Sequence, residues 1–443
     1  MLLLSTLARP VDSGGHVADT VKQSPKRSHL LTALGTPSFA LLWSGQAFST
    51  FGDGVYFVAL AWLILQLTGS ASAMAAVLVA ASIPRLIFLL VGGVVADRLP
   101  RRLVMLWADL GRGVAVAIIA LLTFQHSVQM WHLIALGVFF GFAQAFFIPA
   151  YAALSPLIVP QDHLRSANSL NALSRTLSGL VGPGIGAALV ATVGISWAFA
   201  FDALTFVVSA ASLAFVTARP LTPAAMPAAG RISVRQTFAD LSEGFKYVAG
   251  SAWLWVTIVL AAVANVLRAP FAVSLPRLVN DGYPQQVCFS ASVSGGLHLD
   301  GVCLFGSISV AISIGGIAAT VLTGMLHTIP RRGLVAYLAL LFGNVMMLLF
   351  AVPWGREIGP WMLLLAGAAD GFAVMVFEVI WVTVLQEMIP AEKLGRVSSV
   401  DWLGSLALGP VGIALIGILT DKVGAALIFG GCALLLVAVD AIG

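Results

Sequence analysis

Charged side chains inside long apolar runs are the residues of this sequence that could do chemistry. Four arginines lie in such runs: Arg85, Arg112, Arg175 and Arg268. Six acids also do: Asp53, Asp109, Asp202, Asp370, Glu378 and Asp401. A charged side chain at the centre of a bilayer costs about 2.5–3.5 kcal/mol to insert, so those present usually face a cavity or a partner. Because the acids outnumber the bases, an acid without a partner is a candidate to carry a proton.

A polar stripe marks the first of these runs. Gln46, Ser49, Thr50 and Asp53 follow the spacing i, i+3, i+4 and i+7, which places them on one helix face. Polar side chains that face lipid are costly, so we expect the stripe to line water. Asp53 is then either a protonation or cation-binding site, or a hydrogen-bonding group between helices.

Other charged residues have both functional and structural interpretations. Arg175 lies in a second polar stripe, where it either acts in gating or coupling or pairs with an acid such as Asp401. Arg85 lies in the middle of its run and needs a partner, for which Asp53 is one candidate.

Two further spacings place charged residues together. Asp109 and Arg112 are three residues apart, so we expect them to satisfy each other. Asp370, Glu378 and Trp381 fall on one face of a later run. An aromatic group beside acids suits a lipophilic substrate, although aromatic residues in such runs also pack against lipid or other helices.

The composition is that of an integral membrane protein. The hydrophobic fraction is 59% and the mean hydropathy is +1.00, well above the roughly 45–50% apolar content of soluble domains. Twelve runs are long enough to cross a bilayer. They are 39–67, 71–97, 102–124, 131–156, 166–192, 196–217, 252–279, 302–327, 332–352, 360–388, 395–420 and 424–442.

The basic residues predict the orientation of the chain. Sixteen of the 23 Lys and Arg residues fall in the N-terminal segment and in the loops on the same side as it, and only three lie near the opposite ends of the runs. Basic residues favour the cytoplasmic side, so both termini are expected there. The net charge of +4 is modest and does not indicate binding to nucleic acid.

The sequence repeats itself at an offset of 230 residues. Pro100-Arg101-Arg102 matches Pro330-Arg331-Arg332, and Val193-Gly194 matches Val423-Gly424. We therefore expect a disordered cytoplasmic tail at 1–38, one six-helix half at 39–217, a cytoplasmic linker at 218–248 and a second six-helix half at 249–443.

No cofactor, metal site or enzymatic activity is expected. The three cysteines, Cys288, Cys303 and Cys432, lack metal-binding spacing. Cys288 and Cys303 flank a long outward loop, where they either form a disulfide or remain free thiols. No phosphate-binding motif and no nucleophile–base set occurs, so energy for any transport would come from a gradient.

Several motifs resemble those of major facilitator superfamily transporters. Gly93-x-x-x-Asp97-Arg98-x-x-Arg101-Arg102 resembles the signature loop between helices 2 and 3 of that family. Gly179-x-x-Gly182-Pro183-x-x-Gly186 resembles the helix-5 motif of drug–proton antiporters. With GDGVYFVALAWLILQLTGS from Gly52 and RSANSLNALSRTLSGLVGPGIG from Arg165, the chain looks most like bacterial drug and siderophore exporters related to macrolide and enterobactin efflux proteins.

The resemblance implies an all-α membrane protein with the major facilitator fold, twelve transmembrane helices in two pseudo-symmetric halves. Helices 1, 4, 7 and 10 would line the cavity and present these residues: Gln46, Asp53, Gln144, Asn265, Arg268, Asp370 and Glu378. In the signature loop, Gly93 would allow close helix approach, and Asp97 would contact the start of helix 11 near Ser398 and Ser399 in the outward-open state. The basic residues Arg98, Arg101 and Arg102 would form a charge network or fix orientation.

Two further implications concern helices 4 and 5. The helix-5 motif would thin helix 5 against helix 8. Many antiporters carry an Arg-x-x-Gln-Gly motif in helix 4, whereas this chain has Gln144 and no arginine there, which puts proton coupling by that route in doubt.

The sequence thus predicts a monomeric secondary transporter of the inner (plasma) membrane. Its expected partners are the lipid bilayer, a small-molecule substrate and protons, with proton-coupled export of drugs, macrolides or siderophores by alternating access. Uptake of a nutrient or lipid and a transport-inactive membrane sensor are the alternatives.

Overall fold

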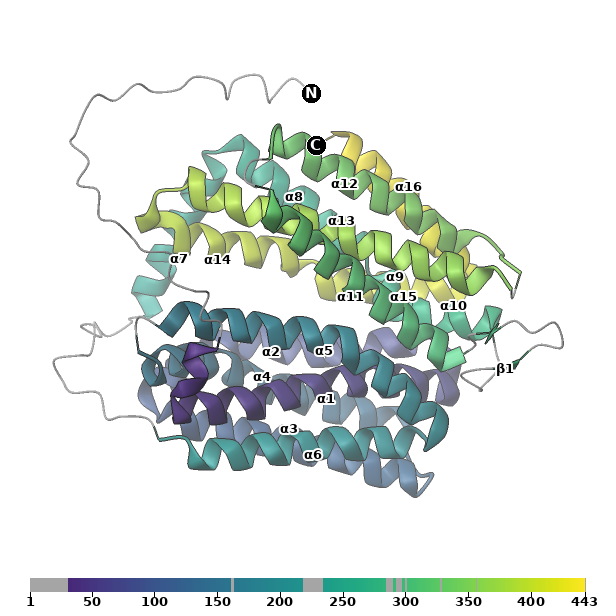
Figure 1. Ribbon diagram of the computed structural model, residues 1–443, viewed down its shortest axis with the longest axis horizontal. Coiled ribbons are helices and arrows are strands. Elements are labelled where there is room, and N and C mark those ends of the chain that lie inside the picture. The colour runs from purple at the N-terminus through teal and green to yellow at the C-terminus, as the bar shows by residue number, and fades with distance from the viewer. Residues whose placement is uncertain are drawn as a thin grey trace.

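The computed structural model is almost entirely helical (Figure 1). It describes residues 31–160, 163–217, 234–283, 290–291, 297–298, 301–326, 329–355 and 357–442. Within these ranges the strands are one short antiparallel pair that places Ser290 opposite His298. They are β1 (Ser290–Ala291) and β2 (Leu297–His298).

The first half of the chain forms one bundle, the lower one in Figure 1. Its elements are η1 (Thr32–Gly35), α1 (Pro37–Thr68), α2 (Ala71–Arg98), α3 (Arg101–Phe124), α4 (Met130–Ile158), α5 (Leu164–Thr192) and α6 (Ile195–Phe215). Each helix from α1 to α6 agrees with its expected run to within two residues. Helical structure begins inside the segment expected as a tail, and residues 1–30 lie outside the described residues.

The second half forms the upper bundle. Its elements are α8 (Ala252–Leu267), α9 (Pro270–Val273), α10 (Leu275–Gly282), α11 (Gly301–Met325), α12 (Arg332–Met347), η3 (Leu348–Ala351), α13 (Gly359–Met388), α14 (Ala391–Ala407), α15 (Gly409–Val423) and α16 (Ala425–Ile442). The expected runs 252–279 and 395–420 correspond to the membrane spans Ala252–Val273 and Lys393–Val423, but each run is divided into shorter helices.

Proline accounts for both interruptions. Pro270 and Pro276 each stand near the start of a new short helix after α8, and Pro410 stands near the start of α15. Proline has no backbone N–H to donate, and its ring clashes with the carbonyl four residues earlier. An apolar run therefore continues through each site while the helix does not.

A further helix, α7 (Val234–Ala249), lies in the segment expected as a linker. It runs along α14, where Arg396 Nη1 donates to Glu243 Oε2 at 2.5 Å and Gly244 packs on the backbone of Arg396. Residues 218–233 of the expected linker lie outside the described residues.

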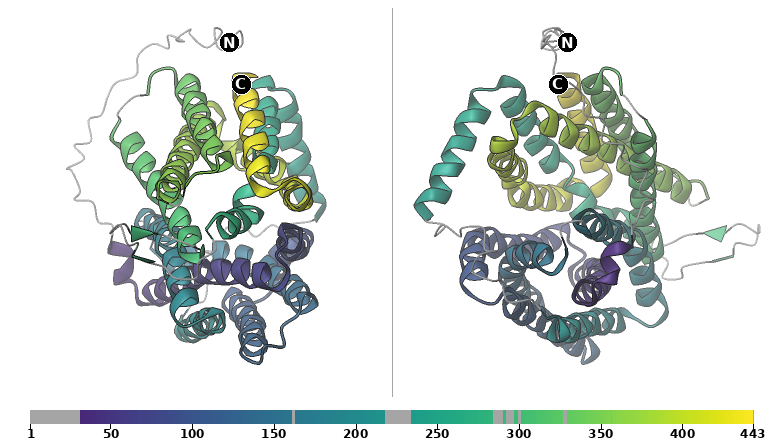
Figure 2. Two further views of the ribbon diagram at one scale, coloured as in Figure 1. Left: turned by 90° about the vertical axis from the view of Figure 1, so that its right-hand side faces the viewer. Right: turned by 60° about the vertical axis from the view of Figure 1, so that its left-hand side comes forward.

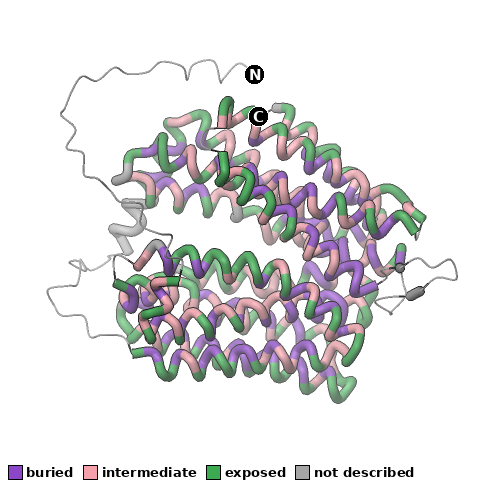
Figure 3. Tube along the Cα trace, viewed as in Figure 1, coloured by how far each residue is buried: buried purple, intermediate pink, exposed green. Residues whose placement is uncertain are grey.

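The helices are built to cross a membrane. Among the described residues, eleven spans are long and apolar enough, and the segment Ala425–Ala441 is a shorter apolar helix. Large apolar side chains are exposed on both bundles, such as Trp107 at 70% and Leu427 at 70% (Figure 3). The chain is therefore a multi-pass membrane protein, since such a surface suits lipid.

The two bundles meet at one end of the molecule. We call the end near β1 the β1 end and the opposite one the α7 end (Figures 1 and 2). The described contacts between the halves lie toward the β1 end: Phe57 against Phe305, Gly306 against Pro183, and Gly417 against Ala71. Toward the α7 end, α2 and α5 carry exposed apolar side chains along the gap (Figure 3). The arrangement is closed at the β1 end and open at the α7 end.

Equivalent glycines join helices inside each half. Gly141 of α4 faces the Ala81 carbonyl of α2, and Gly371 of α13 faces the Ile312 carbonyl of α11. These glycines are 230 residues apart, the offset of the sequence repeat. A side chain at either position would overlap a backbone oxygen, so both helix pairs depend on glycine there.

The structure predicts that Gly141→Ala destabilises the protein. The added methyl group would lie 1.8 Å from the carbonyl oxygen of Ala81. We expect α2 and α4 to separate and the free energy of unfolding to fall by about 1–3 kcal/mol, as overpacking usually costs. Thermal unfolding of the purified protein measures this change.

The matched control is Gly431→Ala in α16, where no described atom lies within 4 Å of the new methyl group. Alanine favours a helix over glycine by about 0.5–1 kcal/mol, so this variant should be neutral or more stable. Equal losses of stability in the two variants would contradict the prediction.

Candidate functional site

A buried polar network lies inside the first bundle, between α1, α3 and α6. Arg112 forms an ion pair with Asp109, as their spacing predicts. The second oxygen of Asp109 accepts hydrogen bonds from Ser209 Oγ at 2.6 Å and from Gln46 Nε2 at 3.2 Å. Gln46 is therefore buried between helices and does not line water, because polar groups of α3 and α6 cover the stripe to which it belongs.

Asp53 lies about two turns of α1 beyond Gln46 and is half-buried. Its Oδ1 atom is buried and has no hydrogen-bond partner among the described residues. The suggested pair with Arg85 is absent from the described ion pairs. Arg85 is on the exposed face of α2, whereas Asp53 Oδ1 points into the bundle.

A second network occupies the other bundle. Arg268, at the end of α8, forms an ion pair with Asp370 of α13. Its Nη2 donates to Asn344 Oδ1 at 2.9 Å, and Asn344 Nδ2 donates to Asp440 Oδ2 at 2.7 Å. The sequence analysis did not identify Asn344 or Asp440 as site residues. No sequence pattern distinguishes Asn344, whereas Asp440 could have been identified because it is an acid inside the last apolar run.

A cavity of about 370 Å³ extends from this network toward the α7 end, lined by α8, α12, α13, α14 and α16. Apolar side chains form much of its wall. Its polar and aromatic lining residues include Thr257, Asn265, Arg268, Tyr337, Glu378, Trp381, Asp401 and Asp440. Residues that the sequence singled out thus meet in one place, among them Asn265, Arg268, Glu378, Trp381 and Asp401.

Aromatic rings and carboxyls share one wall of the cavity. Trp381 Nε1 donates to Asp401 Oδ2 at 3.1 Å, and the ring of Phe377 stacks on Trp381 with centroids 6.3 Å apart. Glu378 is exposed, and the described residues give it no hydrogen-bond partner. The wall therefore presents an apolar surface with acidic groups beside it.

Other candidates lie elsewhere. Arg175 is exposed on α5, and no described ion pair joins it to Asp401, because the halves are apart at the α7 end. Gln144 is half-buried on α4 and is absent from the lining of the cavity. Asn265 Nδ2 donates to the Ser405 carbonyl at 2.9 Å, so it ties α8 to α14 at the cavity wall.

The expected close approach at Gly93 is wrong. No described atom lies within 4 Å of a side chain placed there. The preceding residue, Gly92, makes the approach instead, since a methyl group on it would lie 2.2 Å from the Ala145 carbonyl oxygen of α4. Adjacent glycines on a helix point about 100° apart, so only one of them can face the partner.

The expected contact of Asp97 with the start of helix 11 stays a prediction. Ser398 and Ser399 lie within α14, which begins at Ala391, so they do not form the start of a helix. The side chain of Asp97 lies outside the described residues. Arg98 is exposed at the end of α2.

The next two arginines contact backbone carbonyls near helix ends. Arg101 donates to the carbonyls of Ala96 and Ala153 at 3.4 Å, and Arg102 donates to the Ala214 carbonyl at 2.5 Å. The carbonyls of Ala96 and Ala214 belong to the last turns of α2 and α6, and that of Ala153 lies just before the last turn of α4. Cations are favourable there because the carbonyl end of a helix is negative.

The helix-5 motif serves two neighbours. Gly179 and Pro183 face α11, where Ser313 Oγ donates to the Gly179 carbonyl at 2.7 Å. Gly182 and Gly186 face α1. The expectation that all four residues face helix 8 of the fold, here α11, is therefore correct for two of them only, because positions four apart lie on one face and the two pairs differ.

One carboxylate closes the β1 end. Asp421, at the end of α15, accepts hydrogen bonds from Ser70 Oγ at 2.5 Å, Ala71 N at 2.8 Å and Ser72 N at 3.0 Å. Arg277 of α10 forms an ion pair with the same carboxylate. Asp421 thus caps the first turn of α2, where a helix N-terminus favours negative charge, and it joins the two halves.

The cysteines near this end differ in state. Cys303 is disulfide-bonded, so it is not the free thiol of the alternative interpretation. Cys288, its expected partner, lies outside the described residues. Cys432 is a buried free thiol.

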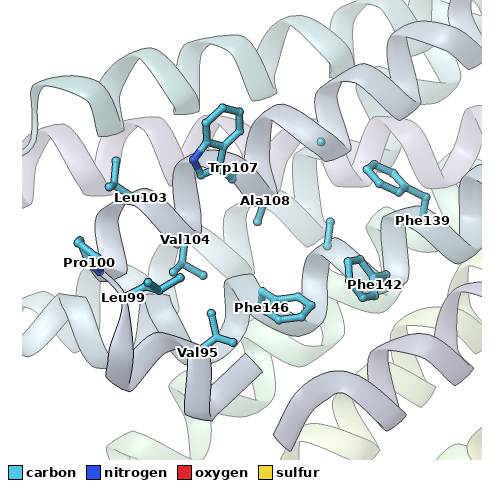
Figure 4. Close-up of a pocket in the computed structure, with 12 residues that line it drawn as sticks. Val95, Leu99, Pro100, Leu103, Val104, Trp107, Ala108, Phe139, Phe142 and Phe146 are labelled. Atoms are coloured by element: carbon cyan, nitrogen blue, oxygen red, sulfur yellow. The ribbon is translucent and has the colours of Figure 1, made fainter. Parts of the chain in front are cut away.

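A separate hollow of about 380 Å³ lies on the first bundle beside the signature loop (Figure 4). It is lined by α2, α3 and α4, with Leu99, Trp107 and Phe146 among its residues. None of the described residues that line it is charged, so it offers only apolar contact.

Residues 42–410 match the sequence model of the Major Facilitator Superfamily. The chain belongs to the major facilitator superfamily. Among similar proteins is the multidrug efflux pump Tap of Mycolicibacterium fortuitum, 28% identical over 90% of this chain and 91% of that protein. Macrolide efflux protein A of Streptococcus pyogenes is 23% identical over 87% of this chain and 90% of that protein.

Solved structures support the major facilitator fold. A bacterial homologue of the iron transporter ferroportin, in an inward-facing state, has a TM-score of 0.68 at 16% identity and covers 92% of this chain and 98% of its own. The nucleoside transporter NupG has a TM-score of 0.68 at 14% identity, covering 91% of this chain and 98% of its own. At these identities the likeness concerns the fold alone.

In this major facilitator protein, Asp421→Asn should weaken closure at the β1 end. The substitution replaces the carboxylate by a neutral amide, so the ion pair with Arg277 and the charged hydrogen bonds to the start of α2 are lost. A hydrogen bond to a charged group contributes about 1.5–3 kcal/mol, so we expect roughly a tenfold shift toward forms open at this end. Spin labels at the exposed positions Leu67 and Val423, one on each half, would report longer distances.

Asp281→Asn is the matched control. Asp281 is an exposed second partner of Arg277 and makes no described contact with α2. Its substitution should leave the distance distribution unchanged. Unchanged distances in Asp421→Asn as well would contradict the role of the carboxylate in closure.

Proposed function

We propose that this protein is a monomeric secondary transporter of the inner (plasma) membrane that exports amphipathic small molecules in exchange for protons. The substrates would be drugs, macrolides or siderophores, moved by alternating access. The observation that carries the proposal is the cavity of the second bundle, in which aromatic rings stand beside the carboxyls of Glu378 and Asp401. The efflux proteins similar to this chain support the direction and the substrate class.

The chemistry of the cavity favours amphipathic cations and weak bases. An apolar molecule gains by leaving water for the aromatic wall, and a positive group on it is attracted both to ring faces and to carboxylates. Arg268 is held by Asp370, so its charge is compensated before any substrate arrives. The acids at the open side of the cavity therefore set its preference.

The proposed orientation places the α7 end in the cytoplasm. The basic residues of the N-terminal segment and the inner loops favour that side. The cavity would then receive substrate from the cytoplasm or the inner leaflet, while Asp421 keeps the β1 end closed. The two halves, 39–217 and 249–443, would rock about the linker 218–248, and the loop from Gly93 to Arg102 would close the cytoplasmic side in the opposite state.

Proton coupling is proposed to use Asp53. It is a half-buried acid in the middle of α1, and its buried oxygen has no hydrogen-bond partner in the part of the chain that is described. A carboxyl in such a setting gains from binding a proton, because burial disfavours its charged form.

The first test uses inverted membrane vesicles that hold a proton gradient read by a pH-sensitive dye. Macrolides, lipophilic cations and siderophores are added in turn. We expect at least one class to cause proton release from vesicles with the wild-type protein, and no release with Asp53→Asn. Glu357→Gln, which changes an exposed acid outside the helices, is the matched control and should behave as wild type. No response to any compound would overturn drug–proton export.

A second test addresses the cavity. Trp381→Ala removes the ring that stacks on Phe377 and binds Asp401, so we expect the apparent KM for a responding compound to rise roughly tenfold, about 1.4 kcal/mol. Trp361→Ala is the matched control, because Trp361 is exposed on the same helix and does not line the cavity. An unchanged KM in Trp381→Ala would place the substrate elsewhere.

A further inference from the structure

A second acid, Asp202 of α6, is buried without compensation in the first bundle. Its exposed fraction is 0%. Thr205 Oγ1 lies 3.2 Å from Asp202 Oδ1, but the same hydroxyl lies 2.7 Å from the Asp202 backbone carbonyl. One hydroxyl proton cannot serve both acceptors fully. Asp202 Oδ2 is buried and has no hydrogen-bond partner among the described residues.

Asp202 lies against the segment of α1 that carries Asp53. A side chain at Gly52 would lie 2.3 Å from both Asp202 Oδ1 and Thr205 Oγ1. The absence of a side chain at Gly52 therefore lets the polar atoms of α6 reach the backbone of α1, one residue before Asp53. Each of the two acids has one buried oxygen that lacks a described partner.

The nearby positive charge is paired with a third acid, although Arg112 Nε is buried and has no hydrogen-bond partner among the described residues. Arg112 forms its ion pair with Asp109, and its guanidinium carbon lies 4.3 Å from the ring centre of Phe147 and 4.8 Å from that of Phe206. Asp109 is also satisfied, since Gln46 and Ser209 donate to it.

The other groups that face the two acids add no cation. The titratable groups that act on them are Asp109 and Arg112 of α3 and Tyr56 of α1. From α5, the neighbours of this part of α1 are the glycines Gly182 and Gly186. Three carboxyls therefore share one arginine in this part of the bundle.

Two carboxylates on facing segments of α1 and α6, with no cation of their own, are costly inside a membrane bundle, and one proton removes most of that cost. Carboxyl pairs held close together in proteins share a proton for the same reason. We propose that Asp53 and Asp202 form a carboxyl pair that binds one proton, and that this is the proton exchanged in transport. The second clause rests on the proposed function.

The two members have different access. Asp202 is wholly buried, whereas Asp53 is half-buried. A proton reaches the pair through Asp53. It stays bound because its loss would leave both carboxyls ionised. When the proton leaves, both carboxyls are ionised against α1 and α6, so the protonation state acts directly on the contact between these helices.

The test is infrared spectroscopy of the full-length protein in lipid nanodiscs at neutral pH. The spectrum of Asp53→Asn/Asp202→Asn is subtracted from that of the wild type. We expect the loss of one protonated-carboxyl C=O band, shifted by deuterium, and of one carboxylate band. Loss of two carboxylate bands and no C=O band would overturn the pair. Glu357→Gln is the control and should remove a carboxylate band only.

A milder variant guards against failure of the double variant to fold. Thr205→Val keeps the shape of the side chain but removes the hydroxyl beside Asp202 Oδ1. The C=O band of the pair should then shift in frequency, and an unchanged band would overturn the assignment. The vesicle assay separates the two proposals: with no proton release for any compound, proton exchange fails while the infrared result still decides whether the pair binds a proton.

Discussion

Each bundle contains one arginine paired with an acid between its helices, buried in the first bundle and half-buried in the second. An arginine cannot lose its charge, so burial in a membrane bundle requires a carboxylate and further polar or aromatic contacts. In the first bundle, Arg112 takes Asp109, which in turn fixes Gln46 of α1 and Ser209 of α6. In the second, Arg268 takes Asp370 and reaches α12 and α16 through Asn344. The first network joins α1, α3 and α6, and the second joins the end of α8 with α12, α13 and α16.

The halves use their polar residues differently. In the first bundle Gln46 and Ser49 of the polar stripe of α1 are buried, whereas Thr50 and Asp53 are half-buried. In the second bundle the network borders a cavity of about 370 Å³ with an aromatic wall. Under the proposed function, one half holds the proton and the other the organic molecule, and the halves contact each other through α5 with α11 and through α2 with α15.

The sequence predicted the fold well because apolar runs of the right length leave few alternatives in a bilayer. It failed where one residue decides between two helical outcomes, as at Pro270 and Pro410, since hydropathy does not register a missing N–H. The sequence also could not show whether Gly92 or Gly93 makes the close approach to α4, because this depends on how α2 is rotated about its axis. For the site, spacing found the local pair of Asp109 and Arg112.

Pairs that depend on tertiary packing were beyond reach from sequence. Arg268 and Asp370 form an ion pair between distant segments, and Arg175 has no described contact with Asp401. The place of Asp202 beside α1 depends on the absence of a side chain at Gly52, which the sequence alone does not reveal.

The breaks after α8 and α14 divide these spans into parts with different contacts. The segments before the breaks line the cavity, and Arg277 and Asp421 on the segments after them close the β1 end. Each of these spans is therefore made of consecutive helices with separate contacts, the first at the cavity and a later one at the closed end.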